Sequence, residues 1–249
     1  MIKIKSRLEI EKMRAAGKIL AETFLALEEH IKPGVTTYEL DNIAKKFIKS
    51  NNALCSFKNY NGYPANICTS VNNQVVHGIP SKNTVLADGD IVSIDIGVLY
   101  QGFHGDSAKT FAVGTISDEA QRLIDVTKES FYKGFQMAHS DNRLLDISSA
   151  IQTYVEENGF SVVRKLVGHG IGAALHEDPE VPNFGKAGRG VRLLPGMTIA
   201  IEPMVNMGTY DVDTLSDGWT VVTADGRLSA HYEHTVLITN NGPELLTIC

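Results

Sequence analysis

The sequence of 249 residues has few cysteines, no long apolar run and no low-complexity linker. Its three cysteines, Cys55, Cys68 and Cys249, are irregularly spaced, which excludes a disulfide framework and a cysteine-rich zinc module. No run approaches the roughly 20 apolar residues that a membrane span requires, and the N-terminus lacks the apolar region of a secretory signal. The absence of a linker predicts one domain, residues 1–249.

The charge balance excludes further classes of protein. A formal net charge of −6 argues against binding nucleic acid or an anionic membrane by bulk electrostatic attraction. We therefore expect a reduced, cytoplasmic monomer with no membrane and no specific nucleic acid among its partners.

The hydrophobic pattern predicts two helices followed by strands, twice over. Apolar residues keep a helical period in four segments: 8–31, 36–50, 117–138 and 144–158. Apolar strand patterns cover 66–71, 90–99, 103–113, 160–168, 197–205, 219–223 and 231–239. This order predicts an α+β protein whose two related halves, about 1–115 and 116–249, share one mixed sheet.

Two acids lie inside the predicted strands of the stretch SIDIGVLYQGFHGDSAKTF at 93–111. Asp95 and Asp106 are symmetric about the midpoint of Tyr100 and Gln101, so a hairpin centred there predicts a directly opposed pair with Cβ atoms about 4.5–5.5 Å apart. Like charges so placed destabilise a sheet, and a divalent cation between them reverses the sign of that effect. The alternative is a solvated face, on which two aspartates cost little.

Three more polar residues stand in apolar surroundings. His169 lies between two glycines in LVGHGIG, Glu202 follows the apolar run TIAI, and Glu233 precedes the run TVLI with His234 between them. Each alone has a plain structural alternative: a histidine satisfied in a loop, or a glutamate paired with a surface Lys or Arg. Together with the aspartates they supply four carboxylates and one imidazole.

Such a set can hold two divalent ions about 3.5–4 Å apart and lower the pKa of a water between them. Its oxygen-rich character suits manganese, iron(II) or cobalt and permits zinc. The predicted metal ligands are Asp95, Asp106, His169, Glu202 and Glu233.

These residues and their flanking motifs resemble the type I methionine aminopeptidases, a group of the pita-bread metallopeptidases. The resemblance covers essentially the whole chain. It rests on HGIP at 77–80, DIVSIDIGVLYQGFHGDSAKTF at 90–111, GHGIG at 168–172, HEDPEVPNFG at 176–185, AIEPM at 200–204 and EHT at 233–235. It implies a pita-bread fold, with two pseudo-symmetric helix-pair and strand halves around a mixed, largely antiparallel sheet and a metal site at its centre.

The resemblance also implies a role for each ligand. Asp95 would chelate one metal, His169 and Glu202 would hold the other, and Asp106 and Glu233 would bridge the two. Glu202 would in addition pass a proton toward the departing amine.

Further positions match residues that contact substrate in the family. His77 would position substrate and stabilise the transition state, and His176 would contact the scissile amide; the alternative for both is a satisfied loop histidine. A soft apolar pocket for an unbranched thioether would be lined by Tyr60, Tyr63, Cys68, Leu175 and Trp219, where Leu175 replaces a phenylalanine of some members. These pocket residues could instead belong to the core.

A monovalent cation is a further cofactor that the resemblance suggests. Main-chain carbonyls would hold it at Asn72, Gln74 and Ser229.

The expected function is metal-dependent removal of the initiator methionine from nascent proteins whose second residue is small, through a hydroxide bridging two metals. The partners would be nascent polypeptide N-termini, with transient contact with the ribosome left open. One alternative is an X-Pro aminopeptidase or prolidase, which usually carries an additional N-terminal domain. The other is a non-catalytic peptide-binding module of the same fold, which typically loses metal ligands.

Overall fold

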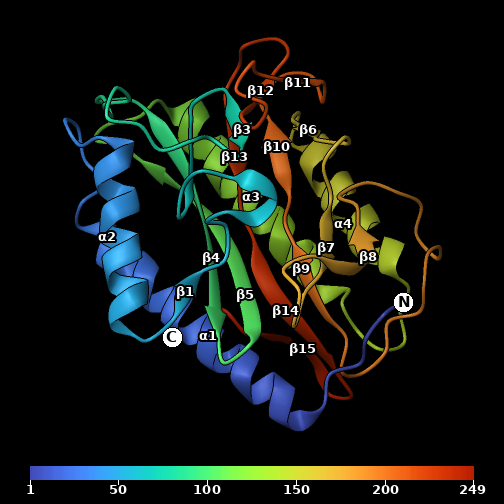
Figure 1. The fold of residues 1–249 in the computed structure, drawn as a ribbon. Coiled ribbons are helices and arrows are strands. Elements are labelled where there is room, and N and C mark those ends of the chain that lie inside the picture. The colour runs from blue at the N-terminus through green and yellow to red at the C-terminus, as the bar shows by residue number, and fades with distance from the viewer.

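The computed structural model describes residues 1–249 and contains the four predicted helices (Figure 1). Helix α1 (Arg7–Glu28) begins with a capping box that Ser6 forms with Glu9, and α2 (Thr37–Ser50) begins with a capping box that Thr36 forms with Glu39. In the second half, α3 (Asp118–Gln136) is capped by Ser117, the first residue of the predicted segment, and α4 (Leu144–Glu157) follows it.

The strands are mostly short and form four sheets in which every strand pair is antiparallel. The first half contains β1 (Leu54–Cys55), β2 (Cys68–Val71), β3 (Gln74–Val76), β4 (Ile91–Tyr100) and β5 (Phe103–Ala112). The second half contains β6 (Ser161–Val162), β7 (Gly168–Gly170), β8 (Glu177–Val181), β9 (Thr198–Ile201), β10 (Met204–Asn206), β11 (Val212–Thr214), β12 (Val221–Thr223), β13 (Ser229–His231), β14 (His234–Thr239) and β15 (Gly242–Leu245). The α+β prediction is confirmed, but the strands form these four antiparallel sheets and not the one mixed sheet expected.

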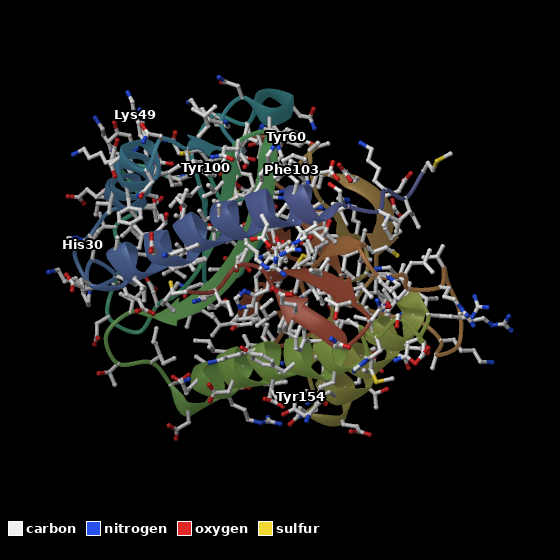
Figure 2. All side chains as sticks on the ribbon, turned by 90° about the horizontal axis from the view of Figure 1, so that it is seen from below. His30, Lys49, Tyr60, Tyr100, Phe103 and Tyr154 are labelled. Carbon is white, nitrogen blue, oxygen red and sulfur yellow. The ribbon has the colours of Figure 1, made fainter.

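Helices cover the strands from two sides. Figure 2 shows α1 on one side of the strands and the pair α3 and α4 on the other. One buried apolar cluster lies within residues 16–113, and a second draws on residues 120–238 together with Ile91. None of the helices is both long and apolar enough to cross a membrane. We propose, on the basis of these two clusters, that residues 1–249 form one catalytic domain built from two halves.

The two halves are joined where β5 lies beside the start of β14. The backbone N–H of Glu233 donates to the carbonyl of Ala108 (2.9 Å). The hydroxyl of Thr235 accepts from the backbone N–H of Asp106 (3.0 Å) and donates to its carbonyl (2.9 Å). This junction brings an acid from each half to the same place.

The register of the β4–β5 hairpin corrects one prediction. Asp95 lies opposite Ala108, and Asp106 lies opposite Gly97, so the two aspartates are diagonal neighbours and not a directly opposed pair. The turn is centred one residue later than predicted because Gln101 and Gly102 form it, with φ of 50° and 82°. A two-residue hairpin turn of this hand favours positive φ at both positions, which glycine adopts readily.

The diagonal placement still leaves both acids on one face of the hairpin. The other face is apolar, because side chains alternate along a strand, and its residues Val92, Ile94, Ile96 and Val98 are fully buried.

Three predicted strands are interrupted. The segment 197–205 breaks at Glu202 and Pro203, since proline lacks the N–H that a sheet ladder needs, and 231–239 breaks at Tyr232 and Glu233. In 160–168 only the short β6 and the first residue of β7 are strand. Two of these interruptions lie at predicted metal ligands.

Candidate active site

A cavity of about 230 Å³ collects the predicted site residues. It is lined by Tyr60, Tyr63, Cys68, His77, Asp95, Asp106, His169, Leu175, His176, Glu202, Trp219 and Glu233, together with Phe57 and Asn61. Every residue predicted from the sequence as a metal ligand, catalytic group or pocket wall therefore faces one space. The wall residues are not merely part of a closed core.

The predicted ligands come from both halves and converge at the junction of β5 and β14. Ligand atoms of Asp106, His169 and Glu233 all lie within 4.8 Å of one another. The Nε2 atom of His169 lies 3.6 Å from Oε1 of Glu202 and 3.8 Å from Oδ2 of Asp106. Oxygen and nitrogen donors thus surround a common space.

The local sequence explains how His169 reaches this space. A Cβ atom on Gly168 would lie 2.3 Å from the carbonyl oxygen of Ala200, and one on Gly170 would lie 2.1 Å from that of Asp178. Only glycine permits these approaches, so the pattern Gly-His-Gly lets a three-residue strand pack closely between its neighbours. The histidine is then held by its backbone.

The tautomer of His169 also favours ligation. Its Nδ1 lies 2.8 Å from the carbonyl oxygen of Gly170, which can only accept, so Nδ1 carries the proton. Burial, with the nearby charge of His176, lowers the pKa of His169 to about 3. The neutral ring therefore presents an unprotonated Nε2 to the acids, as a metal ligand must.

The four carboxylates repel one another in this buried space. Burial raises the pKa of Asp95 to about 7, with the charge of Glu202 adding to the effect and His231 opposing it. Burial raises the pKa of Glu202 to about 8. Burial first, and then the neighbouring carboxylates, raise the pKa values of Asp106 and Glu233 well above their ordinary values. Such a cluster is stable only with bound protons or with cations.

Unpaired polar atoms test whether metal fits. Asp95 Oδ1, Asp106 Oδ1 and Glu233 Oε1 are buried and have no hydrogen-bond partner. Buried polar atoms are almost always paired in folded proteins, so three unpaired carboxylate oxygens around one space require an explanation. Divalent cations supply one, because they bind carboxylate oxygens and cancel their repulsion. The donor set fits metal.

The apolar end of the cavity is built by aromatic contacts. The Tyr63 hydroxyl donates to the carbonyls of Ile67 (3.2 Å) and Gly78 (3.1 Å), which fixes its ring. That ring meets Trp219 edge to face at 5.1 Å, and Cys68 is buried beside them. The result is a rigid pocket of sulfur and aromatic surface.

The two predicted catalytic histidines lie at the border between the pocket and the acids. His176 contacts the His169 ring at 4.1 Å between centroids, and its Nδ1 is 2.7 Å from the Tyr60 hydroxyl. His77 has a left-handed backbone with φ of 58° and lies 6.4 Å from the Trp219 ring. Burial lowers the pKa of His77 to about 4, so its ring is neutral and can donate one hydrogen bond.

Sequence reasoning missed four contributors. Phe57 and Asn61 line the cavity, and Asn183 donates its Nδ2 to the carbonyl of Glu202 (2.9 Å). The Nε2 atom of His231 lies 3.6 Å from Oε2 of Glu202. The position of His231 in an apolar strand pattern was a signal of the kind used for the acids, whereas Phe57, Asn61 and Asn183 gave none.

The residues suggested for a monovalent cation are neighbours in the fold. The N–H of Ser229 donates to the carbonyl of Asn72 (2.9 Å), and Asn72 has φ of 56°. The Gln74 side chain accepts from the N–H of Val71 (2.9 Å).

Comparison with known proteins agrees with this geometry. Residues 11–240 match the model of metallopeptidase family M24. A methionine aminopeptidase of Clostridium perfringens is 63% identical over 248 residues, covering 100% of this chain and 99% of that protein. The solved methionine aminopeptidase of Thermotoga maritima has a TM-score of 0.99 at 47% identity and covers 100% of both chains. The expected pita-bread fold is therefore confirmed.

A prolidase-type structure is more distant. The Xaa-Pro dipeptidase of Bacillus anthracis has a TM-score of 0.78 at 24% identity, covering 98% of this chain and 61% of that one. This likeness shows a shared fold alone. On the family match and the full-length relatives, the chain belongs to metallopeptidase family M24, among its methionine aminopeptidases.

Proposed function

We propose that this chain removes the N-terminal methionine from polypeptides whose second residue is small. The observation that carries the proposal is the cavity in which unpaired carboxylate oxygens lie beside an apolar wall. The first feature suits hydrolysis assisted by metal, and the second suits one apolar side chain. The names of the full-length relatives support the same activity.

Two divalent ions are the proposed cofactors, drawn from cobalt, manganese, iron and zinc. Asp95, Asp106, His169, Glu202 and Glu233 would hold them, since these side chains line one cavity and ligand atoms of Asp106, His169 and Glu233 lie within 4.8 Å of one another. When bound, the ions would supply Lewis acidity and would lower the pKa of a water molecule toward neutral.

The apolar wall would select the first residue of the substrate. Tyr63, Cys68, Leu175 and Trp219 surround a space that suits an unbranched thioether, because sulfur and aromatic edges make favourable contacts with it. A branched or charged side chain would lose packing or remain unpaired there. The pocket therefore supports a preference for methionine.

The histidines would act on the peptide bond. His77 and His176 border both the acids and the pocket, so each can donate a hydrogen bond to the scissile carbonyl or amide. Tyr60 holds Nδ1 of His176 and so orients the ring. Glu202 lines the same cavity as both histidines, so its carboxylate would accept a proton from water and pass it to the departing amine.

The biological setting is proposed on the same basis. The substrates would be N-termini of newly made proteins, met in the cytoplasm by a monomer. We also propose a monovalent cation near Asn72, Gln74 and Ser229 as a cofactor. We propose a transient association with the ribosome, which cosedimentation can test.

Peptide kinetics test the proposal. We expect kcat/KM for Met-Ala-Ser to exceed that for Lys-Ala-Ser and Met-Lys-Ser by orders of magnitude, with norleucine tolerated in place of methionine. Comparable rates for all these peptides would refute the placement of the pocket, and preferential cleavage of X-Pro bonds would assign the chain to the prolidases.

A further inference from the structure

A buried ion pair outside the cavity contacts the loop that carries two of its lining residues. The ammonium of Lys5 lies 2.8 Å from Oε2 of Glu177, and both side chains are only 4% exposed. Lys5 precedes α1, and Glu177 opens β8, so the pair joins segments 172 residues apart. Charged residues are seldom buried to this extent, and the reaction described above uses neither of them.

The carboxylate of Glu177 also holds the loop itself. Residues 172–176 contain no helix or strand, and this segment includes the pocket wall Leu175 and the proposed catalytic His176. The other carboxylate oxygen, Oε1, accepts the backbone N–H of Ala174 at 3.2 Å. The Glu177 carboxylate therefore holds the loop through the Ala174 N–H, and Lys5 holds the carboxylate.

Lys5 is itself held firmly. Its backbone N–H donates to the carbonyl of Gly196 (2.8 Å), and its ammonium also donates to the carbonyl of Lys3 (3.3 Å). The side chain packs against Gly172, where an added Cβ would lie 2.5 Å from Cε of Lys5. Burial raises the pKa of Glu177, but the hydrogen bonds from Lys5 and Ala174 outweigh it and keep the carboxylate charged.

We propose that the Lys5–Glu177 ion pair is a positioning device that holds His176 and Leu175 in the geometry that binds substrate. The pair acts through the loop and touches no substrate atom. His176 is adjacent to Glu177 in the chain, and its ring is held on the other side by Tyr60, so movement of Glu177 displaces His176 relative to that anchor. This inference rests on the proposed function for its kinetic test.

Removing the ammonium tests the device. For Lys5→Met we expect kcat/KM for Met-Ala-Ser to fall about 10- to 100-fold with metal content unchanged, because small misplacements of a positioning group cost this much. Discrimination between methionine and lysine as the first residue should weaken as Leu175 shifts. Glu177→Gln, which keeps an acceptor for the Ala174 N–H, provides a second variant if Lys5→Met does not fold.

Arg14→Met is a control for the loss of an ion pair elsewhere in the chain. Arg14 forms a partly exposed ion pair from α1 to Glu244 of β15 at 2.7 Å, away from the loop. We expect this variant to lose stability while kcat/KM stays near that of the wild type. An equal loss of kcat/KM in Lys5→Met and Arg14→Met would overturn the proposal, because it would reflect general destabilisation.

Combination with His176→Ala separates positioning from stability. If Lys5 acts through His176, Lys5→Met should change kcat by less than about twofold in the His176→Ala background. Independent, multiplying losses would contradict the proposal.

Hydrogen exchange gives a readout that needs no activity. The Ala174 amide should exchange faster in Lys5→Met and not in Arg14→Met. Unchanged exchange at Ala174 would overturn the positioning role, whatever the peptide assay shows. A wild type that cleaves no methionine peptide would refute the proposed function and leave the positioning role to the exchange measurement.

Discussion

Metal binding to the carboxylate cluster should depend steeply on pH. The pKa of Asp95 rises to about 7 and that of Glu202 to about 8, so the metal-free protein holds protons that a metal must displace. Each displaced proton makes the apparent affinity change about tenfold per pH unit. The pKa values of Asp106 and Glu233 are raised as well, so at least two protons are displaced, and we expect affinity to rise at least about 100-fold from about pH 6 to about pH 7.

The direction of the pKa shifts sets how the stability of the metal-free protein changes with pH. An acid whose pKa is raised in the folded state binds extra protons there, so the free energy of unfolding of the metal-free protein falls as pH rises from the unfolded pKa near 4 through about 7 to 8. Buried histidines such as His77 and His231, with pKa values of about 4, have the opposite effect: they lower the free energy of unfolding as pH falls below their unfolded pKa of 6.5.

The magnitude is measurable by thermal unfolding. A 100-fold gain in affinity at fixed free metal above Kd adds about 3 kcal/mol to the free energy of unfolding. For a chain of this size that corresponds to about 5–10 °C in Tm. The assay compares chelated protein with and without manganese at pH values across this range.

A matched variant sharpens the test. Glu202→Gln removes one displaced proton, so its affinity should change about tenfold less per pH unit than that of the wild type. A metal-induced rise in Tm that is independent of pH in both proteins would show that the carboxylates are ionised before metal binds, which would refute the electrostatic account of the cluster.

Four substitutions probe the other parts of the site. Asp106→Asn should lower both metal affinity and activity by more than about 100-fold, because losing a residue that only supports a metal ligand already costs about 10- to 100-fold. Metal analysis and turnover measure the two losses, and full activity would contradict Asp106 as a metal ligand. Alanine at His77 or His176 should lower kcat about 100- to 1,000-fold with metal content unchanged; loss of metal in His77→Ala would instead make it a ligand. Trp219→Ala should reduce the preference for methionine over other first residues more than it lowers kcat, and an unchanged preference would exclude Trp219 from the pocket wall.

Local rules account for the parts of the fold that were predictable. The capping box of Thr36 and Glu39 marks the start of α2 because both partners lie within one helical turn. Asp95 and Asp106 were recognisable as site residues because alternation places them opposite a fully apolar face.

Tertiary structure decides the parts of the fold that could not be predicted from the sequence. The hairpin register depends on whether Gln101 adopts a positive φ, which its residue type does not require. The pairing of Lys5 with Glu177 joins positions far apart in the chain, and either residue alone looks like an ordinary surface charge. The three-dimensional fold, and not a local pattern, buries them.

The most direct test of the central claim is cleavage of Met-Ala-Ser by the same protein before and after metal removal, with an Ala-Pro peptide alongside. The account predicts no release of methionine by chelated protein, recovery when a divalent metal is returned, and no cleavage of Ala-Pro. Release of methionine at full rate in excess chelator, or cleavage of Ala-Pro in preference to Met-Ala-Ser, would contradict it.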